Sequence, residues 1–366
     1  MAVPAIRERL SPDAFRLPVE KIRDGYYTDV YFNYTKEVLE EIGRHPHVTM
    51  QLFQKHDRSL VGGIDEAIAV LKQCSGTRGP GGDWQRGWDQ LEVKALYEGD
   101  EIEPYETVMT IEGDFTLFAH LETVYLGCLA RRSLVMRNVR DVVEAASGKP
   151  ILFMPARHDH WAVQTGDGWA AHVAGSIGVS TEAQASWWGG RGVGTVPHAL
   201  IAAFGGDTVA AARAFAGRYS DDMNVTVLVD FDNDSVRTAI EVADALGDRL
   251  WGVRLDTSER MVDKALWDRM GEFEPTGVNT ELAKLVRDAL DEAGHERVQI
   301  VASGGFDAAK IRHFEELGAP VDAYGVGSSL VRGENDFTAD VVRLEGRPAA
   351  KAGRRFKPNP RLERVV

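Results

Sequence analysis

The 366-residue sequence has only two cysteines, no long hydrophobic run and no excess of positive charge. With Cys74 and Cys128 alone, neither a disulfide framework nor an all-cysteine zinc site is expected. No uninterrupted apolar run approaches the ~18 residues that span a bilayer, and the first 20 residues lack the apolar core of a signal peptide. The formal net charge of −14 disfavours binding to nucleic acid or to an anionic membrane surface. We therefore expect a cytoplasmic protein whose partners are neither nucleic acids nor membranes.

Two glycine-rich motifs of nucleotide-binding folds are also missing. The segments GRGVGTVP and GVGSSL each lack a later glycine that the Walker A loop or the Rossmann fingerprint requires. A phosphate ligand is therefore expected to bind in a different way.

Positive charge is concentrated at the C-terminal end. Residues 343–366 contain eight lysines and arginines and two glutamates, a net charge of +6. Such a run is most simply a solvated terminus, and the alternative is a segment that covers an anionic substrate.

The first part of the chain has the patterns of strands and turns. We expect an arm over 1–20, strands over 48–60 and 91–112, a loop over the glycine-rich 76–87, and a helix over about 117–147.

After residue 150, short β-branched runs alternate with amphipathic helices. The run NVTVLVDFDN precedes DSVRTAIEVADALGD, in which Val236, Ile240 and Ala243 share one helix face. Alternation of strand and helix at intervals of about 30–40 residues is typical of parallel βαβ units. Six or seven such strands predict an α/β fold built on a TIM-type barrel, irregular or incomplete.

In such barrels, functional side chains lie at the carboxyl ends of the strands. The residues that follow the apolar runs are Arg157-His158-Asp159-His160, Ser180-Thr181, His198, Asp230, Asp232, Arg254, Asp256, Ser303-Gly304-Gly305 and Gly325-Val326-Gly327-Ser328. The two glycine clusters after the last two strands predict a phosphate cradle, because glycine allows close backbone approach and helix starts donate N–H groups. The alternative is that these glycines serve only tight turns.

Carboxylates and guanidinium groups alternate at the other strand ends. Asp230 and Asp256 can hold ribose hydroxyls, magnesium or a developing cation, whereas Asp232 is placed to cap a helix. Arg157 and Arg254 suit a carboxylate or phosphate, although each can instead form an ion pair with these aspartates.

His198 follows GVGTVP and can act as a base or accept a phosphoryl group. His158 and His160 have the spacing of two metal ligands, but a metal hydrolase needs further ligands from other strands.

Six segments in order resemble nicotinate phosphoribosyltransferases, particularly the shorter archaeal-type branch of this type II phosphoribosyltransferase family. They are TDVYFNYT (28–35), HLETVYLGCLARRS (120–133), AGSIGVSTEAQAS (174–186), GVGTVPHALI (192–201), GVRLDTS (252–258) and SGGFDAAKI (303–311). The stretch EGDEIEPYETVMTIEG also resembles the N-terminal β-domain shared with quinolinate phosphoribosyltransferase.

The resemblance implies an N-terminal β-rich sandwich domain over 1–115, an α/β barrel over 116–330, and a basic tail over 331–366 that packs back on the N-terminal domain. It implies a homodimer, or a higher homo-oligomer, with active sites shared between subunits. The implied reaction joins nicotinate to phosphoribosyl pyrophosphate, giving nicotinate mononucleotide for NAD biosynthesis together with pyrophosphate. Mg²⁺ is the implied cofactor, and ATP is a co-substrate hydrolysed through a phosphorylated histidine.

The resemblance also assigns a role to each candidate residue. Tyr31 would stack on the pyridine ring from the neighbouring subunit, with Asp29 beside it. The other assignments are Arg157, Ser180 and Arg254 to the ring pocket, His198 to the phosphorylated histidine, Asp230 and Asp256 to ribose and magnesium, and Ser303, Gly304, Gly305, Gly327 and Ser328 to the 5′-phosphate. Magnesium would be held through the substrate, with Asp230 and Asp256 as the available protein ligands, so no protein-only metal site is expected. His158 stands where the family often has a second arginine.

Four alternatives remain open. Nicotinamide as the base predicts an acceptor for its carboxamide, and quinolinate predicts a denser cluster of cations. A metal-dependent barrel hydrolase would use His158 and His160. A binding module would bind without turnover.

Overall fold

The computed structural model describes residues 7–366, which form two compact units. The described residues up to Arg137 form one unit together with Gly333–Val366, and Asn138–Arg332 form the other. The division falls inside the long helix α4 (Glu122–Ala145) rather than at residue 115, because this helix continues from one unit into the other. The first six residues of the expected N-terminal arm lie outside the described residues.

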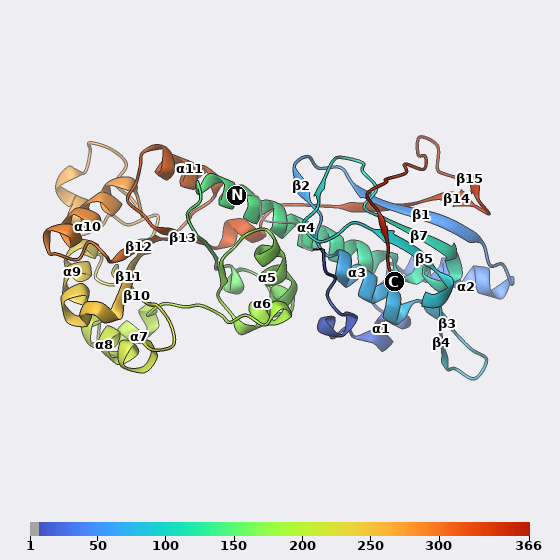
Figure 1. The fold of residues 1–366 in the computed structure, drawn as a ribbon, viewed down its shortest axis with the longest axis horizontal. Helices are drawn as coiled ribbons and strands as arrows, with labels where there is room; N and C mark the ends of the chain where they lie inside the picture. The colour runs from blue at the N-terminus through green and yellow to red at the C-terminus, as the bar shows by residue number, and fades with distance from the viewer. Residues whose placement is uncertain (1–6) are drawn as a thin grey trace. The chain divides into compact units, whose positions relative to one another are not determined.

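The unit containing the N-terminal residues is built on a six-stranded antiparallel sheet with the order β15-β14-β1-β7-β5-β16 (Figure 1). Its strands are β1 (His47–Gln54), β5 (Glu92–Ala95), β7 (Met109–Asp114), β14 (Phe337–Leu344), β15 (Arg347–Pro348) and β16 (Glu363–Arg364). A second pair consists of β2 (Ser59–Leu60) and β6 (Glu101–Ile102). The helices are α1 (Val19–Arg23), α2 (Val30–Glu41), α3 (Ile64–Cys74) and the first part of α4.

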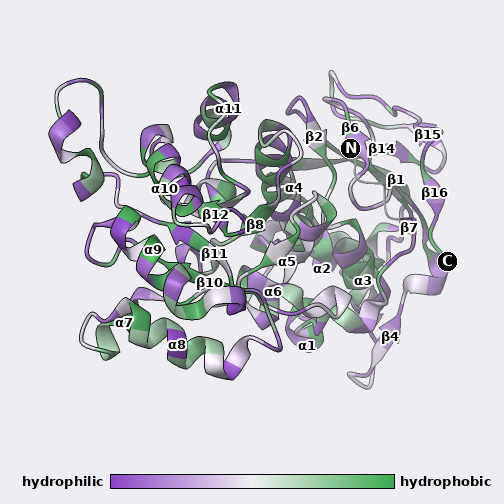
Figure 2. Cartoon of the chain, turned by 60° about the vertical axis from the view of Figure 1, so that its left-hand side comes forward, coloured by the Kyte–Doolittle hydropathy of each residue, from purple (hydrophilic) through white to green (hydrophobic). Residues whose placement is uncertain are grey.

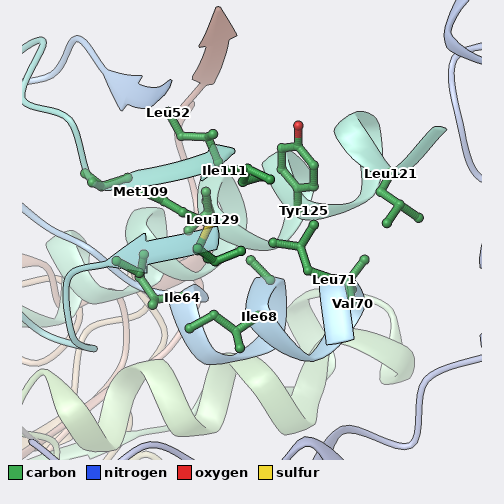
Figure 3. Packing of buried hydrophobic residues seen from close by; sticks show 14 of the residues in the cluster. Leu52, Ile64, Ile68, Val70, Leu71, Met109, Ile111, Leu121, Tyr125 and Leu129 are labelled. Carbon is green, nitrogen blue, oxygen red and sulfur yellow. The ribbon is translucent and has the colours of Figure 1, made fainter. Parts of the chain in front are cut away.

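One face of this sheet carries the core of the unit. Along β7, the buried Met109 and Ile111 alternate with partly exposed residues, so one side of the strand faces the core. Figure 3 shows these side chains packed with Ile68 of α3 and with Tyr125 and Leu129 of α4. Each fully buried side chain of this size stabilises the fold by about 1.5–3 kcal/mol. The β-rich sandwich expected here therefore has helices as its second layer.

The glycine-rich segment 76–87 is a hairpin, not the predicted loop. Strands β3 (Gly76–Arg78) and β4 (Trp84–Arg86) pair antiparallel, and Gly82, with φ +84°, forms the turn between them. The many glycines of this segment predict a loop, and the two strands are only three residues long, so the sequence pattern does not indicate them.

The basic tail lies along the same sheet. The Gln51 side chain accepts from Lys357 N at 2.9 Å and donates to the Arg355 carbonyl at 3.0 Å. Arg354 pairs with Asp340 of β14 at 3.1 Å. The side chains of Arg354, Arg355 and Lys357 contribute to the lining of a cavity of about 630 Å³.

The other unit is a curled parallel sheet with the order β10-β11-β12-β13-β8-β9. Its strands are β8 (Ile151–Phe153), β9 (Gly178–Val179), β10 (Val225–Leu228), β11 (Leu250–Leu255), β12 (Gln299–Ala302) and β13 (Ala323–Val326). Residues 192–196 join the two edges, because Val193 N donates to Val179 O at 2.7 Å and Val196 N donates to Thr226 O at 2.9 Å. This ring of short strands confirms the irregular TIM-type barrel.

Helices separate the strands of the barrel. They are α5 (Gln164–Val173), α6 (Glu182–Ala185), α7 (His198–Ala203), α8 (Thr208–Tyr219), α9 (Ser235–Leu246), α10 (Thr280–Glu292) and α11 (Ala308–Glu316). In Figure 2, α10 carries hydrophilic and hydrophobic bands. Its buried residues include Leu282, Val286 and Leu290, which repeat at helical spacing, as expected for a helix with one side against the core.

Within residues 7–366, no helix combines the length and the apolar character that crossing a bilayer requires. Cys74 and Cys128 are both free thiols.

Candidate active site

A cavity of about 570 Å³ opens at the carboxyl ends of the barrel strands. Twelve of the residues singled out from the sequence line it: Arg157, His158, Ser180, His198, Arg254, Asp256, Ser303, Gly304, Gly305, Gly325, Gly327 and Ser328. They follow six different strand segments, which come together because parallel strands present their carboxyl ends to the same side of a barrel.

The first glycine turn has a backbone that other residues adopt only with strain. Gly304 and Gly305 both have positive φ, at +86° and +69°. A Cβ on Gly305 would lie 1.7 Å from Glu259 Oε1, and one on Gly304 would lie 3.3 Å from Thr257 O. The positive φ of both residues therefore favours glycine, and the same turn presents bare backbone to the cavity.

The helix that follows this turn contributes less than expected to a phosphate cradle. Asp307 caps α11 by accepting from Lys310 N at 2.8 Å, so that backbone donor is already engaged. After β13, the strand next to β12, Gly327 and Ser328 begin a short 3-10 turn. The candidate phosphate donors are therefore the backbone groups of the two loops.

Arg254 and Asp256 are held together at the end of β11. Arg254 Nη2 lies 3.3 Å from Asp256 Oδ1, so the ion pair considered from the sequence is present. Arg254 Nε also donates to Ser303 Oγ at 2.7 Å, and Nη1 lies 3.5 Å from Thr195 Oγ1. Both charged groups line the cavity while being partly buried, so an anion and a cation are available side by side.

His198 and Asp230 form a second pair. His198 Nε2 donates to Asp230 Oδ1 at 2.9 Å, which places the ring proton on Nε2 and leaves the lone pair on Nδ1. This hydrogen bond raises the pKa of His198 above its ordinary value. The side chain of His198 is 43% exposed, whereas that of Asp230 is only 7% exposed. Asp230 therefore supports His198 and is not part of the cavity wall described above, although the sequence places it at a strand end like Asp256.

The HxH segment does not converge on one site. His158 lines the cavity beside Arg157, and burial together with the charges of Arg157 and Arg332 lowers its pKa. His160 instead accepts from Ala162 N through Nδ1 at 3.2 Å. Within residues 7–366, no three His, Cys, Asp or Glu side chains are grouped to hold a metal ion.

Three residues from the sequence lie elsewhere. Asp232 pairs with Arg237 at 3.3 Å. Asp29 and Tyr31 belong to the other unit, at the beginning of α2, where Tyr31 is 58% exposed. Asp29 Oδ2 accepts from Thr123 Oγ1 at 2.9 Å.

The sequence reasoning gave no role to Thr195, which lines the cavity from the segment that closes the barrel. Thr195 lies within the GVGTVP motif, so its position before His198 was the available signal.

The arrangement combines bare glycine loops, cationic side chains and one carboxylate around a single space. Such a set can bind a phosphorylated, anionic substrate and can stabilise positive charge that develops next to it. The histidine adds a nucleophilic nitrogen whose protonation Asp230 controls.

Comparison with known proteins connects this geometry to a family. Residues 29–133 match the family model described as quinolinate phosphoribosyl transferase, N-terminal domain. A Mycobacterium tuberculosis (strain H37Rv) protein named nicotinate phosphoribosyltransferase pncB1 is 30% identical over 278 residues, which are 74% of this chain and 57% of that protein. Nicotinate phosphoribosyltransferase of Bacillus subtilis (strain 168) is 24% identical over 240 residues, 65% of this chain and 45% of that protein. The chain thus spans about half the length of these curated relatives.

Solved structures extend the similarity over nearly the whole chain. Nicotinate-nucleotide pyrophosphorylase from Pyrococcus furiosus is 31% identical with a TM-score of 0.78, covering 96% of this chain and 86% of that one. Human nicotinic acid phosphoribosyltransferase, at 18% identity and a TM-score of 0.68, shares the fold over 88% of this chain and 76% of its own.

Proposed function

The chain belongs to the type II phosphoribosyltransferase family, and we propose on that premise that it joins nicotinate to phosphoribosyl pyrophosphate. The products are nicotinate mononucleotide, a precursor of NAD, and pyrophosphate. The observation that carries this proposal is the single cavity in which Asp256 and Arg254 face the two glycine loops.

The chemistry of the reaction matches these groups. Displacement at the anomeric carbon develops positive charge on the ribosyl ring and releases negative charge on pyrophosphate. Asp256 offers an anion for the ring, and Arg254 offers a cation for the carboxylate of nicotinate. The pyridine nitrogen already has a lone pair, so no general base is needed. The loops at Gly304 and Gly327 would hold the 5′-phosphate.

Magnesium is proposed to bind chiefly through pyrophosphate. Mg²⁺ usually takes one or two carboxylates together with phosphate oxygens and waters. Asp256 fits this pattern, because it lines the cavity and keeps Oδ2 to offer while its Oδ1 is engaged by Ser303, whereas Asp230 is not among the lining residues. The ion would neutralise charge on the leaving group.

ATP coupling is proposed to act through His198. The residue lies on the cavity wall, is half exposed, and has its Nδ1 lone pair available for phosphoryl transfer.

A homodimer with shared sites is proposed from the surface of α2. No residue of this helix is buried, and Val30, Tyr34, Val38 and Ile42 form an exposed apolar stripe at four-residue spacing. Tyr31 at the same end would stack on the pyridine ring bound to the partner subunit, contributing about 1 kcal/mol. Location in the cytoplasm stays a prediction from the sequence.

Turnover with three bases tests the proposed function. Nicotinate, nicotinamide and quinolinate are each incubated with phosphoribosyl pyrophosphate and Mg²⁺, with and without ATP, and the mononucleotide is measured. We expect nicotinate to be used at least tenfold faster than the others, because one carboxylate matches the one Arg254 guanidinium. Preferred conversion of quinolinate or nicotinamide would contradict the assignment, and absence of turnover with all three would reject the reaction.

Subunit mixing tests the shared site. Tyr31→Ala alone should keep about a fifth of wild-type activity, since about 1 kcal/mol is roughly a fivefold change, and Asp256→Asn alone should be nearly inactive, with the two defects in different halves of a composite site. When the two variants are co-assembled at random, half of the dimers are mixed and each contains one intact site, so activity should rise to about 30% of wild type, against about 10% for the same variants assembled separately. The activity of purified mixtures is the measurement. Asp256→Asn mixed with Arg254→Ala provides the control, since both defects lie in the same half and no recovery is expected. A Tyr31→Ala mixture that also fails to recover would exclude sharing through Tyr31.

A further inference from the structure

Ser303 occupies a different place from the one its motif suggests. It begins the SGG turn, for which phosphate binding is the obvious role, yet its side chain is buried, with 2% of the residue exposed. Its hydroxyl oxygen lies 2.7 Å from Arg254 Nε, 2.7 Å from Asp256 Oδ1 and 2.9 Å from the Leu255 carbonyl oxygen.

The donors and acceptors of this cluster leave little freedom. A hydroxyl has one proton and two lone pairs, so Ser303 accepts from the Arg254 guanidinium and donates to Asp256 or to the Leu255 carbonyl. The ionised carboxylate is the stronger acceptor of the two. Because Arg254 Nη2 also lies 3.3 Å from Asp256 Oδ1, the three side chains close a triangle. The hydroxyl is thus engaged on two sides and is not available to a phosphate.

This triangle selects which edge of the guanidinium group meets a substrate. Nε is held by Ser303 and Nη2 by Asp256, whereas Nη1 has only the long 3.5 Å contact with Thr195 Oγ1. A planar fork fixed at two nitrogens has one orientation, so the Nη1 side is the part of Arg254 left to bind an anion.

We propose that Ser303 is a positioning residue that orients Arg254 toward the carboxylate of the pyridine substrate and determines how tightly that carboxylate is bound. The inference rests on the proposed function, because it deepens the role of the same cavity. Ser303 thus has a different role from its neighbours Gly304 and Gly305, whose backbone groups are the proposed phosphate ligands.

The test is the steady-state kinetics of Ser303→Ala with both substrates varied. Loss of the hydroxyl leaves the Arg254 Nε–H without its hydrogen-bond partner and allows the guanidinium group to change orientation. The kcat/KM for nicotinate should therefore fall roughly ten- to hundredfold. The KM for phosphoribosyl pyrophosphate should change less than twofold, because the phosphate loops are untouched. Ser303→Cys, which is slightly larger but keeps a weak hydrogen-bonding group, should lie between wild type and Ser303→Ala.

Two controls separate positioning from a general structural role. Ser329, whose hydroxyl donates to Phe306 O at 2.8 Å, follows the other loop and does not touch Arg254, so Ser329→Ala should leave both KM values unchanged. In an Arg254→Lys background, Ser303→Ala should cost less than twofold further in kcat/KM, because the residue it positions is gone.

The possible outcomes are distinct from failure of the proposed function. If wild type does not use nicotinate, the proposed function is wrong. If wild type is active but Ser303→Ala matches it, or raises the KM for phosphoribosyl pyrophosphate instead, or remains fully additive with Arg254→Lys, the positioning role is wrong.

Discussion

Replacing Asp256 with asparagine is expected to lower kcat by about 100-fold or more, by analogy with the loss of one preorganised electrostatic contact in a catalytic site. The carboxylate lines the cavity between the Arg254 fork and the glycine turn at Gly304. Asparagine has nearly the same shape and keeps an oxygen that can accept from Ser303, so the change removes charge rather than packing. The cation-like ribosyl state would then lose its nearest anion, and kcat measured at saturating substrates reports that loss.

Asp232→Asn is the matched control. Asp232 comes shortly after a barrel strand, β10, as Asp256 comes after β11. However, it pairs with Arg237 at 3.3 Å and is not among the residues that line the cavity. Its kcat should stay within twofold of wild type. A loss below tenfold in Asp256→Asn, or an equal loss in both variants, would remove Asp256 from the proposed mechanism.

The second large effect is expected from His198→Ala. This variant should retain weak synthesis of the mononucleotide without ATP and should lose all stimulation by ATP, because the nucleophilic nitrogen is gone while the rest of the cavity remains. Rates with and without ATP are the first measurement, and transfer of label from γ-labelled ATP to the protein is the second. His160→Ala is the control, since that exposed imidazole hydrogen-bonds within its own turn and should leave both unchanged. ATP stimulation that persists in His198→Ala would reject the role.

The pH dependence of this step follows from the Asp230 hydrogen bond. A nucleophilic imidazole must be neutral, and the bond to Asp230 raises the pKa of His198. The ATP-dependent rate should therefore increase as pH rises through that raised pKa. In Asp230→Asn the stabilisation of the protonated ring is lost, so the rising limb should move to lower pH. An unmoved pH profile would contradict the assigned function of Asp230.

Much of the barrel is predictable because its patterns are local. The run NVTVLVDFDN contains β10, and the helical repeat after it contains α9 over Ser235–Leu246. Gly247, with φ +54°, ends that helix. The strand-end rule then names Arg254, Asp256 and His198 as residues of one cavity without any knowledge of distances.

Other features depend on contacts between distant parts of the chain. Residues 192–196 close the barrel although they contain two glycines and only isolated bridges to β9 and β10. The antiparallel sheet acquires its strands β14 and β16 from the C-terminal segment, which pairs with β1 and β5. The hydrophobic periodicity of a short segment does not indicate which distant strand it will pair with.

The chain alone therefore determined the order of strands and helices, the glycine turn at 304–305 and the set of side chains at the barrel mouth, since backbone conformation and apolar periodicity are properties of short segments. Only the tertiary structure decided what each of those side chains does. Asp230 and Asp256 occupy equivalent positions after neighbouring strands, yet one carboxylate bonds to a histidine 32 residues away and the other to a serine 47 residues away. A hydrogen bond requires two groups within about 3 Å of each other, and residues so far apart in sequence reach that distance only when their parallel segments pair side by side, as β11 does with β12 and as Val196 does with Val227 of β10.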